Sequence, residues 1–167
     1  TDERKFFTDN EHELLFTQTQ YQLATNTDSE IDLTFFNHPV KSIHLVSGKA
    51  TGNDWDSEYT FSSSTLYING TPLFEDTSPV YHHTVVPEMH SSDLPDDILE
   101  DLPTFTWPFC LGLSKSNPTG TLNFSRIDNA KLSISGPSGG NALHRVYAVN
   151  YNILRVKQGM GGVAFGN

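Results

Sequence analysis

Two stretches near the C-terminal end decide the fold: residues 118–130 read PTGTLNFSRIDNA, and residues 147–165 read YAVNYNILRVKQGMGGVAF. In the first, Pro and Gly favour a turn, and the Thr, Leu, Phe and Ile that follow favour a strand. In the second, a run rich in Val, Tyr and Ile predicts a long strand, and the glycines after it predict a bend. Both stretches therefore indicate β-structure.

Strand-like segments and turn signals alternate through the rest of the chain. The clearest pattern places Trp107, Phe109, Leu111 and Leu113 on one face of a strand at residues 106–113. Similar segments, rich in Thr, Val, Ile, Phe or Tyr, occupy residues 13–23, 31–36, 40–47, 65–69, 121–127, 130–135 and 145–156. About eight strands with no helical pattern between them predict an all-β fold, an eight-stranded antiparallel jelly-roll sandwich.

A long Pro-rich loop is predicted at residues 70–104, between the fourth and fifth of these strands. Its five prolines exclude a long helix: Pro72, Pro79, Pro87, Pro95 and Pro103. Residues 88–101 hold six acidic residues and no Lys or Arg, with a short helical turn expected at 96–102. Such an acidic stretch is either a solvated loop or a contact with another subunit.

The length of 167 residues suits one domain with a sizeable core, so we expect a single domain over 1–167 with a lead-in at 1–11. The chain starts at Thr1 without a signal segment, which predicts a soluble fragment or a processed product. Cys110 is the only cysteine, which excludes an internal disulfide and favours a small buried side chain. No stretch is as long and apolar as a transmembrane helix requires.

Charge is distributed unevenly along the chain. Residues 1–101 hold 19 acidic and 4 basic residues, a net charge of −15, whereas residues 102–167 hold 1 acidic and 6 basic residues, a net charge of +5. The two parts are expected to attract each other, or the opposite part of a neighbouring copy. Direct nucleic-acid binding is disfavoured because the basic residues are scattered singly.

Adjacent histidines, His82 and His83, are the first candidate metal ligands, with Glu88 and His90 nearby in the sequence. On an extended chain neighbouring side chains point to opposite sides, so this pair cannot readily bind one ion. We interpret them as packed or loop-anchoring histidines, and we predict no metal site.

Alternating acids at Asp54, Asp56 and Glu58 resemble the start of a calcium-binding loop. The pattern then requires Gly and Glu at positions that hold Tyr59 and Thr65. A charged surface loop therefore explains these acids better than a calcium site does.

Gly159, Gly161 and Ala164 match the letters of a dinucleotide-binding loop, but too few residues follow them for the required helix and strand. No serine lies in a G-x-S-x-G elbow, so we predict no catalytic residue, no cofactor and no enzymatic activity. Two glycosylation sequons begin at Asn69 and Asn123. Asn69, at an expected turn, is the better candidate, but without secretion we expect neither to be used.

Residues 123–129, NFSRIDN, and 148–152, AVNYN, resemble strings near the end of the major capsid proteins of nucleocytoplasmic large DNA viruses. Weaker likenesses follow in the same order as in that family, at residues 3–7, 10–15, 18–22, 38–41, 66–70 and 81–84. These proteins contain two consecutive jelly rolls, and three copies form a pseudo-hexagonal capsomer. The resemblance implies that the chain is the second, C-terminal jelly roll of a shell protein.

The resemblance also implies partners and a location. The expected partners are two further copies in a homotrimer, neighbouring capsomers and minor capsid proteins, in a virion assembled in the host cytoplasm. Acidic loop residues of one copy are predicted to meet basic residues of another barrel; the candidate contact residues are Asp93, Asp96, Asp97, Glu100, Asp101, Arg126, Arg145 and Arg155.

Two alternatives share the jelly-roll fold. One is a carbohydrate-binding module, whose sugar platform would use exposed aromatic side chains such as Trp55, Tyr59, Tyr67 or Tyr81. The other is a scaffold or minor capsid protein.

Overall fold

The structure, a computed structural model, describes residues 2–25, 29–49, 61–91, 104–136 and 142–166. Its helical segments are α1 (Asp2–Asp9), η1 (Tyr81–Val85, a π-helical turn), α2 (Val86–His90) and η2 (Phe124–Arg126, a 3-10 turn). Its strands are β1 (His12–Thr25), β2 (Glu30–Asp32), β3 (Pro39–Lys49), β4 (Ser63–Ile68), β5 (Thr71–Thr77), β6 (Thr104–Pro108), β7 (Leu122–Asn123), β8 (Ala130–Ser135), β9 (Ala142–Lys157) and β10 (Met160–Val163).

Two antiparallel sheets form the body of the molecule. The first has the order β1-β9-β3-β6, with β10 paired to β9 and β7 paired to β3; the second has the order β2-β8-β4-β5. Each sheet therefore combines strands from both ends of the chain, which is the arrangement of a jelly roll. The predicted all-β jelly roll is confirmed.

The core lies between the sheets and follows from the alternation of apolar side chains. On β8, Ala130, Leu132 and Ile134 are buried at every second position, and on β9 Val146 and Ala148 are buried in the same way. Burying a side chain such as Leu or Ile contributes about 1.5–3 kcal/mol to stability. The central residues include Phe36, Ile43, Leu45, Leu66, Phe105, Trp107 and Phe124.

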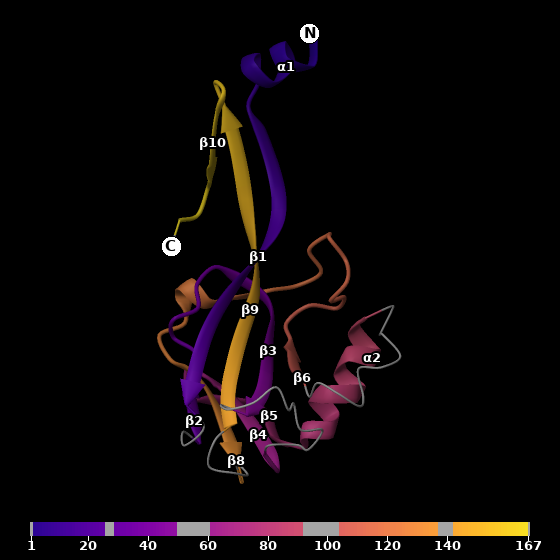
Figure 1. The fold of residues 1–167 in the computed structure, drawn as a ribbon, viewed down its shortest axis with the longest axis vertical. Helices are drawn as coiled ribbons and strands as arrows, with labels where there is room; N and C mark the ends of the chain where they lie inside the picture. Colours follow the sequence, from indigo (N-terminus) through magenta and orange to yellow (C-terminus); the bar gives the residue numbers. More distant parts are fainter. Residues whose placement is uncertain (1, 26–28, 50–60, 92–103, 137–141, 167) are drawn as a thin grey trace.

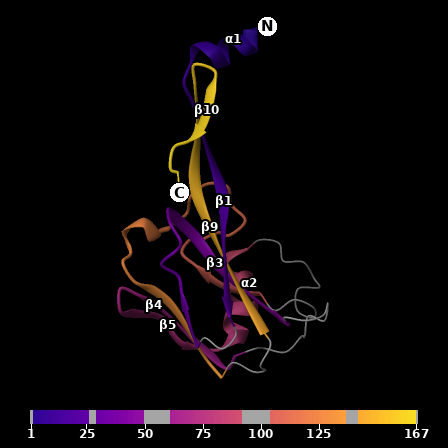
Figure 2. The ribbon, with the colours of Figure 1, turned by 60° about the vertical axis from the view of Figure 1, so that its left-hand side comes forward.

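The two longest strands, β1 and β9, extend well beyond the body. Figure 1 shows them continuing past the other strands, with β10 alongside and α1 at the tip, and Figure 2 shows the same projection from another side. They pair without a register shift from His12↔Val156 to Thr25↔Leu143. One continuous strand pair thus belongs both to the barrel and to the projection.

Five predicted strands, at residues 13–23, 40–47, 65–69, 130–135 and 145–156, are confirmed as β1, β3, β4, β8 and β9. Each of them carries a clear two-residue alternation or a long run of β-branched and aromatic residues.

Three other predicted strands are shorter than expected. The segment 31–36 leaves the sheet after Asp32, because the Asp32 carboxylate accepts a hydrogen bond from the Thr34 N–H (2.9 Å) and forms a turn. The segment 106–113 ends at Pro108, so Leu111 is 79% exposed instead of facing the core. The segment 121–127 is two residues of β7 followed by η2, whose first turn is capped by the Asn123 side chain.

The prediction of one loop over residues 70–104 is wrong for its described part. Residues 71–77 form β5, and residues 81–90 form η1 and α2, while 92–103 lie outside the described residues. The described part of the chain contains ten strands rather than eight, and the lead-in at 1–11 contains α1. β5 is irregular, with positive φ at Phe74 (51°) and Asp76 (47°). Its sequence shows no clear strand pattern, so this strand was not predicted.

Gly120, in the first of the two opening stretches, is predicted to be intolerant of a side chain. Its φ is +144°, and a Cβ there would lie 2.6 Å from the Phe109 carbonyl oxygen. We expect Gly120→Ala to lower the free energy of unfolding by about 1–3 kcal/mol, measured by denaturant titration. Gly162→Ala is the control, because a Cβ at that position meets open space. Equal effects of the two substitutions would contradict this assignment.

Candidate assembly site

The AVNYN motif forms a buried hydrogen-bond network in the middle of β9. Asn150 is fully buried, and its Oδ1 accepts a hydrogen bond from Gln20 Nε2 of β1 (3.0 Å). The Gln20 amide also donates to the Asn37 carbonyl (2.8 Å) and accepts from the Asn37 N–H (3.1 Å). Gln20 therefore ties the loop before β3 to both long strands.

Asn152 makes a second network two residues further along β9. Its Nδ2 donates to Gln18 Oε1 of β1 (3.1 Å) and to the Phe165 carbonyl (2.9 Å). The Ala164 N–H donates to the Ile153 carbonyl (2.7 Å). These bonds hold the C-terminal segment against the base of the projection.

The NFSRIDN motif fastens the turn η2 to the residue before β3. Phe124 is buried in the core, its N–H donates to the His38 carbonyl (3.0 Å), and the His38 N–H donates to Ser125 Oγ (2.8 Å). His38 itself adopts a positive φ of 68°. Both motifs of the sequence analysis are thus framework elements that position the chain.

Asn69, the candidate glycosylation residue, is exposed at the turn between β4 and β5. Its Oδ1 accepts hydrogen bonds from the N–H groups of Asp128 (3.2 Å) and Asn129 (3.1 Å). The side chain therefore holds the turn against the neighbouring loop.

His82 and His83 bind the outer edge of β6, the last strand of the first sheet. His82 Nδ1 donates to the Thr106 carbonyl (3.0 Å), and His83 Nδ1 donates to the Thr104 carbonyl (3.0 Å). The anchoring role predicted for them is confirmed. The two histidines lie on the π-helical turn η1 and not on an extended chain, and this turn lets neighbouring side chains reach alternate carbonyls of one strand. They occupy an edge that would otherwise be available for pairing with another chain.

Burial lowers the pKa of His82 and of two nearby histidines, His44 and His144. It lowers the pKa of His82 from 6.5 to about 4, although the hydrogen bond to Thr106 acts in the opposite direction. His82 also stacks on Trp107, with ring centroids 4.4 Å apart. Burial likewise lowers the pKa of His44, which lies between Ser42 and Thr106, to about 4, and it lowers the pKa of His144.

Cys110 is buried, as predicted, near Lys41 and Tyr151. Burial raises the pKa of the Cys110 thiol and of the Tyr151 hydroxyl, so both stay protonated near neutral pH. Lys41 Nζ donates to the Lys115 carbonyl (2.8 Å). This cluster fixes the loop after β6 and offers no activated nucleophile.

The predicted contact residues are only partly visible. All five acidic candidates, Asp93, Asp96, Asp97, Glu100 and Asp101, lie outside the described residues. Arg126 is exposed on η2, and Arg145 is partly buried on β9. Arg155 binds Glu13 (2.6 Å) and Glu11 (3.3 Å) of its own chain, which raises the pKa of its guanidinium group.

The other candidate sites are not assembled in the described part of the chain. Asp54, Asp56, Glu58, Trp55 and Tyr59 lie outside it. The two remaining aromatic candidates are on different elements, Tyr67 on β4 and Tyr81 on η1. Among the described residues, no three His, Cys, Asp or Glu side chains gather closely enough to hold a metal ion.

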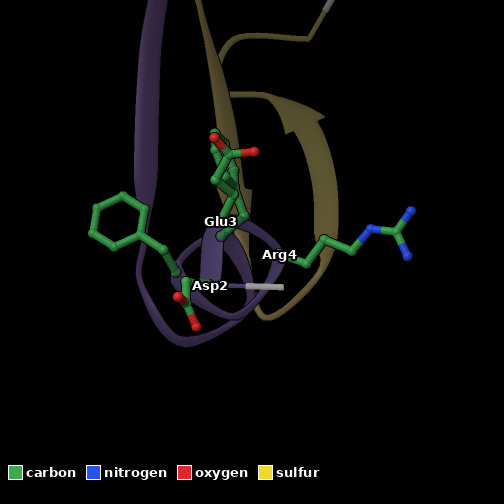
Figure 3. A pocket seen from close by; sticks show the side chains of 5 residues that line it. Asp2, Glu3 and Arg4 are labelled. Atoms are coloured by element: carbon green, nitrogen blue, oxygen red, sulfur yellow. The ribbon is translucent and has the colours of Figure 1, made fainter.

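A shallow hollow on α1, shown in Figure 3, is lined by Asp2, Glu3, Arg4, Phe6 and Phe7. The labelled side chains of Asp2, Glu3 and Arg4 point in different directions rather than toward one centre. The hollow therefore has no convergent set of polar groups. None of the helices in the described ranges has the length and apolar character needed to cross a membrane.

An exposed apolar surface on the projection was missed by the sequence analysis. Leu14, Leu15 and Phe16 are 53%, 49% and 37% exposed, and Val163 on β10 is 50% exposed. Three consecutive apolar residues on a strand place apolar groups on both of its faces. This run was the feature of the sequence that could have predicted the exposed surface. An exposed apolar surface of this kind suggests a contact with another protein domain.

The chain resembles known proteins over almost its whole length. The sequence pattern of a family described as "Large eukaryotic DNA virus major capsid protein" matches residues 3–162. The chain belongs to this major capsid protein family.

Individual members of the major capsid protein family show the same relationship. The major capsid protein of Pyramimonas orientalis virus is 37% identical over 187 aligned residues, which cover 100% of this chain and 46% of that protein. The major capsid protein of Phaeocystis pouchetii virus is 34% identical over 157 residues, which cover 79% of this chain and 29% of that protein. The chain therefore spans less than half the length of either relative.

The fold agrees with a solved capsid structure. A quasi-atomic model of the PBCV-1 virus capsid superposes with a TM-score of 0.75 and 24% identity, over 99% of this chain and 54% of that chain. The jelly roll of this major capsid protein family member is thus an arrangement also found in an assembled shell.

Stability is predicted to fall as the pH drops from 6.5 to 4. The lowered pKa of His82 means that the unfolded chain binds more protons in this range, so stability is complete above pH 6.5 and is lost toward pH 4. One such histidine contributes about 3 kcal/mol over the full range. The free energy of unfolding, measured by urea titration at each pH, reports this loss.

His82→Asn keeps a donor near the Thr106 carbonyl and removes the titrating ring, so we expect a shallower pH dependence between pH 6.5 and 4. Thr84→Ala, on the same helical turn, removes no ionisable group and is the control. An unchanged slope in His82→Asn would show that His82 does not carry this pH dependence.

Proposed function

We propose that the chain is the second, C-terminal jelly roll of a major capsid protein, and that three copies of the complete subunit form a pseudo-hexagonal capsomer of an icosahedral shell. The observation that carries this proposal is the 37% identity to a major capsid protein over the whole chain. Because the chain spans less than half of that relative, trimer formation is proposed for the complete subunit. The expected setting is the virion, assembled in the host cytoplasm, with neighbouring capsomers and minor capsid proteins as partners.

A structural rather than enzymatic role suits the physical design of the domain. The strings that resemble the family would serve as framework, since Gln18, Gln20, Asn150 and Asn152 join the two longest strands by side-chain hydrogen bonds. The histidines of η1 occupy the β6 edge, which reduces random strand pairing between crowded copies. A shell module needs both properties, because it repeats the same few contacts many times by symmetry.

Charge is proposed to guide the contacts between subunits. The acidic residues at 93–101 of one copy would meet Arg126 or Arg145 of a neighbouring barrel. Glu13 and Glu11 of the same chain already bind the guanidinium group of Arg155, so an acidic residue of a neighbouring copy would have to compete with them for this arginine.

The proposal predicts that the complete subunit, expressed from its whole coding sequence, has the mass of three copies in native mass spectrometry and a pseudo-hexagonal outline in electron micrographs. Reversing the acidic charges should weaken the trimer about tenfold at low salt and less at high salt, because salt screens exposed charges. The reversed variant carries Asp93→Lys, Asp96→Lys, Asp97→Lys, Glu100→Lys and Asp101→Lys.

The matched control reverses Glu75 and Asp76, which are exposed acids on β5. If the five reversals leave the trimer unchanged at low salt, the charge-guided contact is wrong while the capsid role stands. If the complete subunit is a monomer under all conditions, the proposed capsomer itself is wrong.

A further inference from the structure

Of the two faces of the projection, one carries ion pairs beside the apolar pair Leu15 and Ile153, and the other is more uniformly apolar. We define the ribbon as residues 12–17 of β1, residues 152–157 of β9, and β10; it extends beyond the body in Figures 1 and 2. The register places Leu14, Leu154 and Val163 directly opposite one another across its three strands. On the other side, Glu13 faces Arg155, and their side chains form an ion pair of 2.6 Å. The Leu14 side is therefore the apolar face.

The apolar face continues the core-facing side of the barrel. The pairing of β1 with β9 has no register shift, and side chains alternate along a strand, so Leu14 and Phe16 share a side with the buried Ala24. Inside the body this side is covered by the second sheet, whereas on the ribbon Leu14 and Val163 are about half exposed (53% and 50%). The sequence thus keeps a core-like surface where its own fold provides no cover.

The tip of the molecule extends the same surface. Phe7 of α1 stacks on His12, with ring centroids 4.2 Å apart, and His12 lies on the Leu14 side of β1. Phe6 and Phe7 are nevertheless 57% and 50% exposed. The helix therefore adds aromatic area beside the apolar face.

We propose that the apolar face of the ribbon is the docking surface for the other jelly roll of the same subunit. This inference rests on the proposed function. The relatives contain about as much further polypeptide as this chain, since it covers 46% of one capsid protein and 54% of a solved capsid chain. Both ends of the described chain lie near the ribbon in Figure 1, so polypeptide that continued from either end would start in its neighbourhood.

Attachment on the same polypeptide makes such docking favourable. A tethered domain has an effective concentration in the millimolar range, so a patch of moderate size can be covered permanently. A second copy of the ribbon fits less well, because two identical faces pair by twofold symmetry, whereas the proposed capsomer is threefold. The rest of the subunit is therefore the occupant that the observations favour.

The test places a photo-crosslinking residue on each face of the ribbon in the complete subunit. Phe16→p-benzoylphenylalanine probes the apolar face, and Leu15→p-benzoylphenylalanine, the neighbouring residue on the opposite face, is the matched control. We expect the Phe16 probe to crosslink to residues outside 1–167 of its own polypeptide at least tenfold more efficiently than the Leu15 probe. Mixing isotope-labelled and unlabelled subunits separates crosslinks within a chain from those between chains.

Three outcomes would overturn the inference: a Phe16 probe that crosslinks to another subunit, a probe that crosslinks to no protein, or a coding sequence without another jelly roll. Val163→p-benzoylphenylalanine, in the same apolar row as Leu14, repeats the test if the Phe16 variant does not fold. Native mass spectrometry of the same samples reports trimer formation separately. A trimer without the expected crosslink rejects the docking surface, and a monomer with the crosslink rejects the capsomer.

Discussion

The structure depends on strand β9 and on the two buried amides that it carries. Residues 143–156 of β9 pair with β1 along one edge, and residues 142–150 pair with β3 along the other, so β9 joins β1 to the rest of the first sheet. Asn150 and Asn152 are 0% and 2% exposed, and each binds a glutamine of β1. An unpaired buried amide costs about 1–3 kcal/mol, so a slipped register would be penalised at both positions.

The same strand pair connects the rigid barrel to the surface proposed for assembly. Since β1 and β9 continue from the core into the ribbon without a register shift, the barrel determines where the apolar face lies. At the far edge of that sheet, His82 and His83 occupy the carbonyl groups of β6 that another chain could bind. The barrel thus exposes the apolar face that is proposed for docking, and it protects the edge of β6 from pairing with strands of other chains.

The sequence allowed the fold class and the long strands to be predicted, because strands such as β8 and β9 bury apolar side chains at every second position. The prediction of strand ends failed where local hydrogen bonds override that pattern, as at Asp32, whose carboxylate ends β2. The helical turn that carries His82 was missed because prolines surround it. The ribbon was missed because consecutive apolar residues predict a strand without showing which face its own fold covers. The family motifs were recognised, but their hydrogen-bond partners are distant in sequence and could not be derived.

The measurement that most directly tests this account is hydrogen exchange of the β9 and β10 amides in Asn152→Ala, with Thr17→Ala on the exposed side of β1 as the control. Loss of the bonds to Gln18 and Phe165 should accelerate exchange at residues 160–164 about tenfold, since a buried hydrogen bond is worth about 1–3 kcal/mol. Residues 144–150, held between β1 and β3, should keep their protection. Unchanged exchange at 160–164, or equal acceleration at 160–164 and 144–150, would contradict the claim that Asn152 fastens the C-terminal segment with β10 to an independently stable barrel.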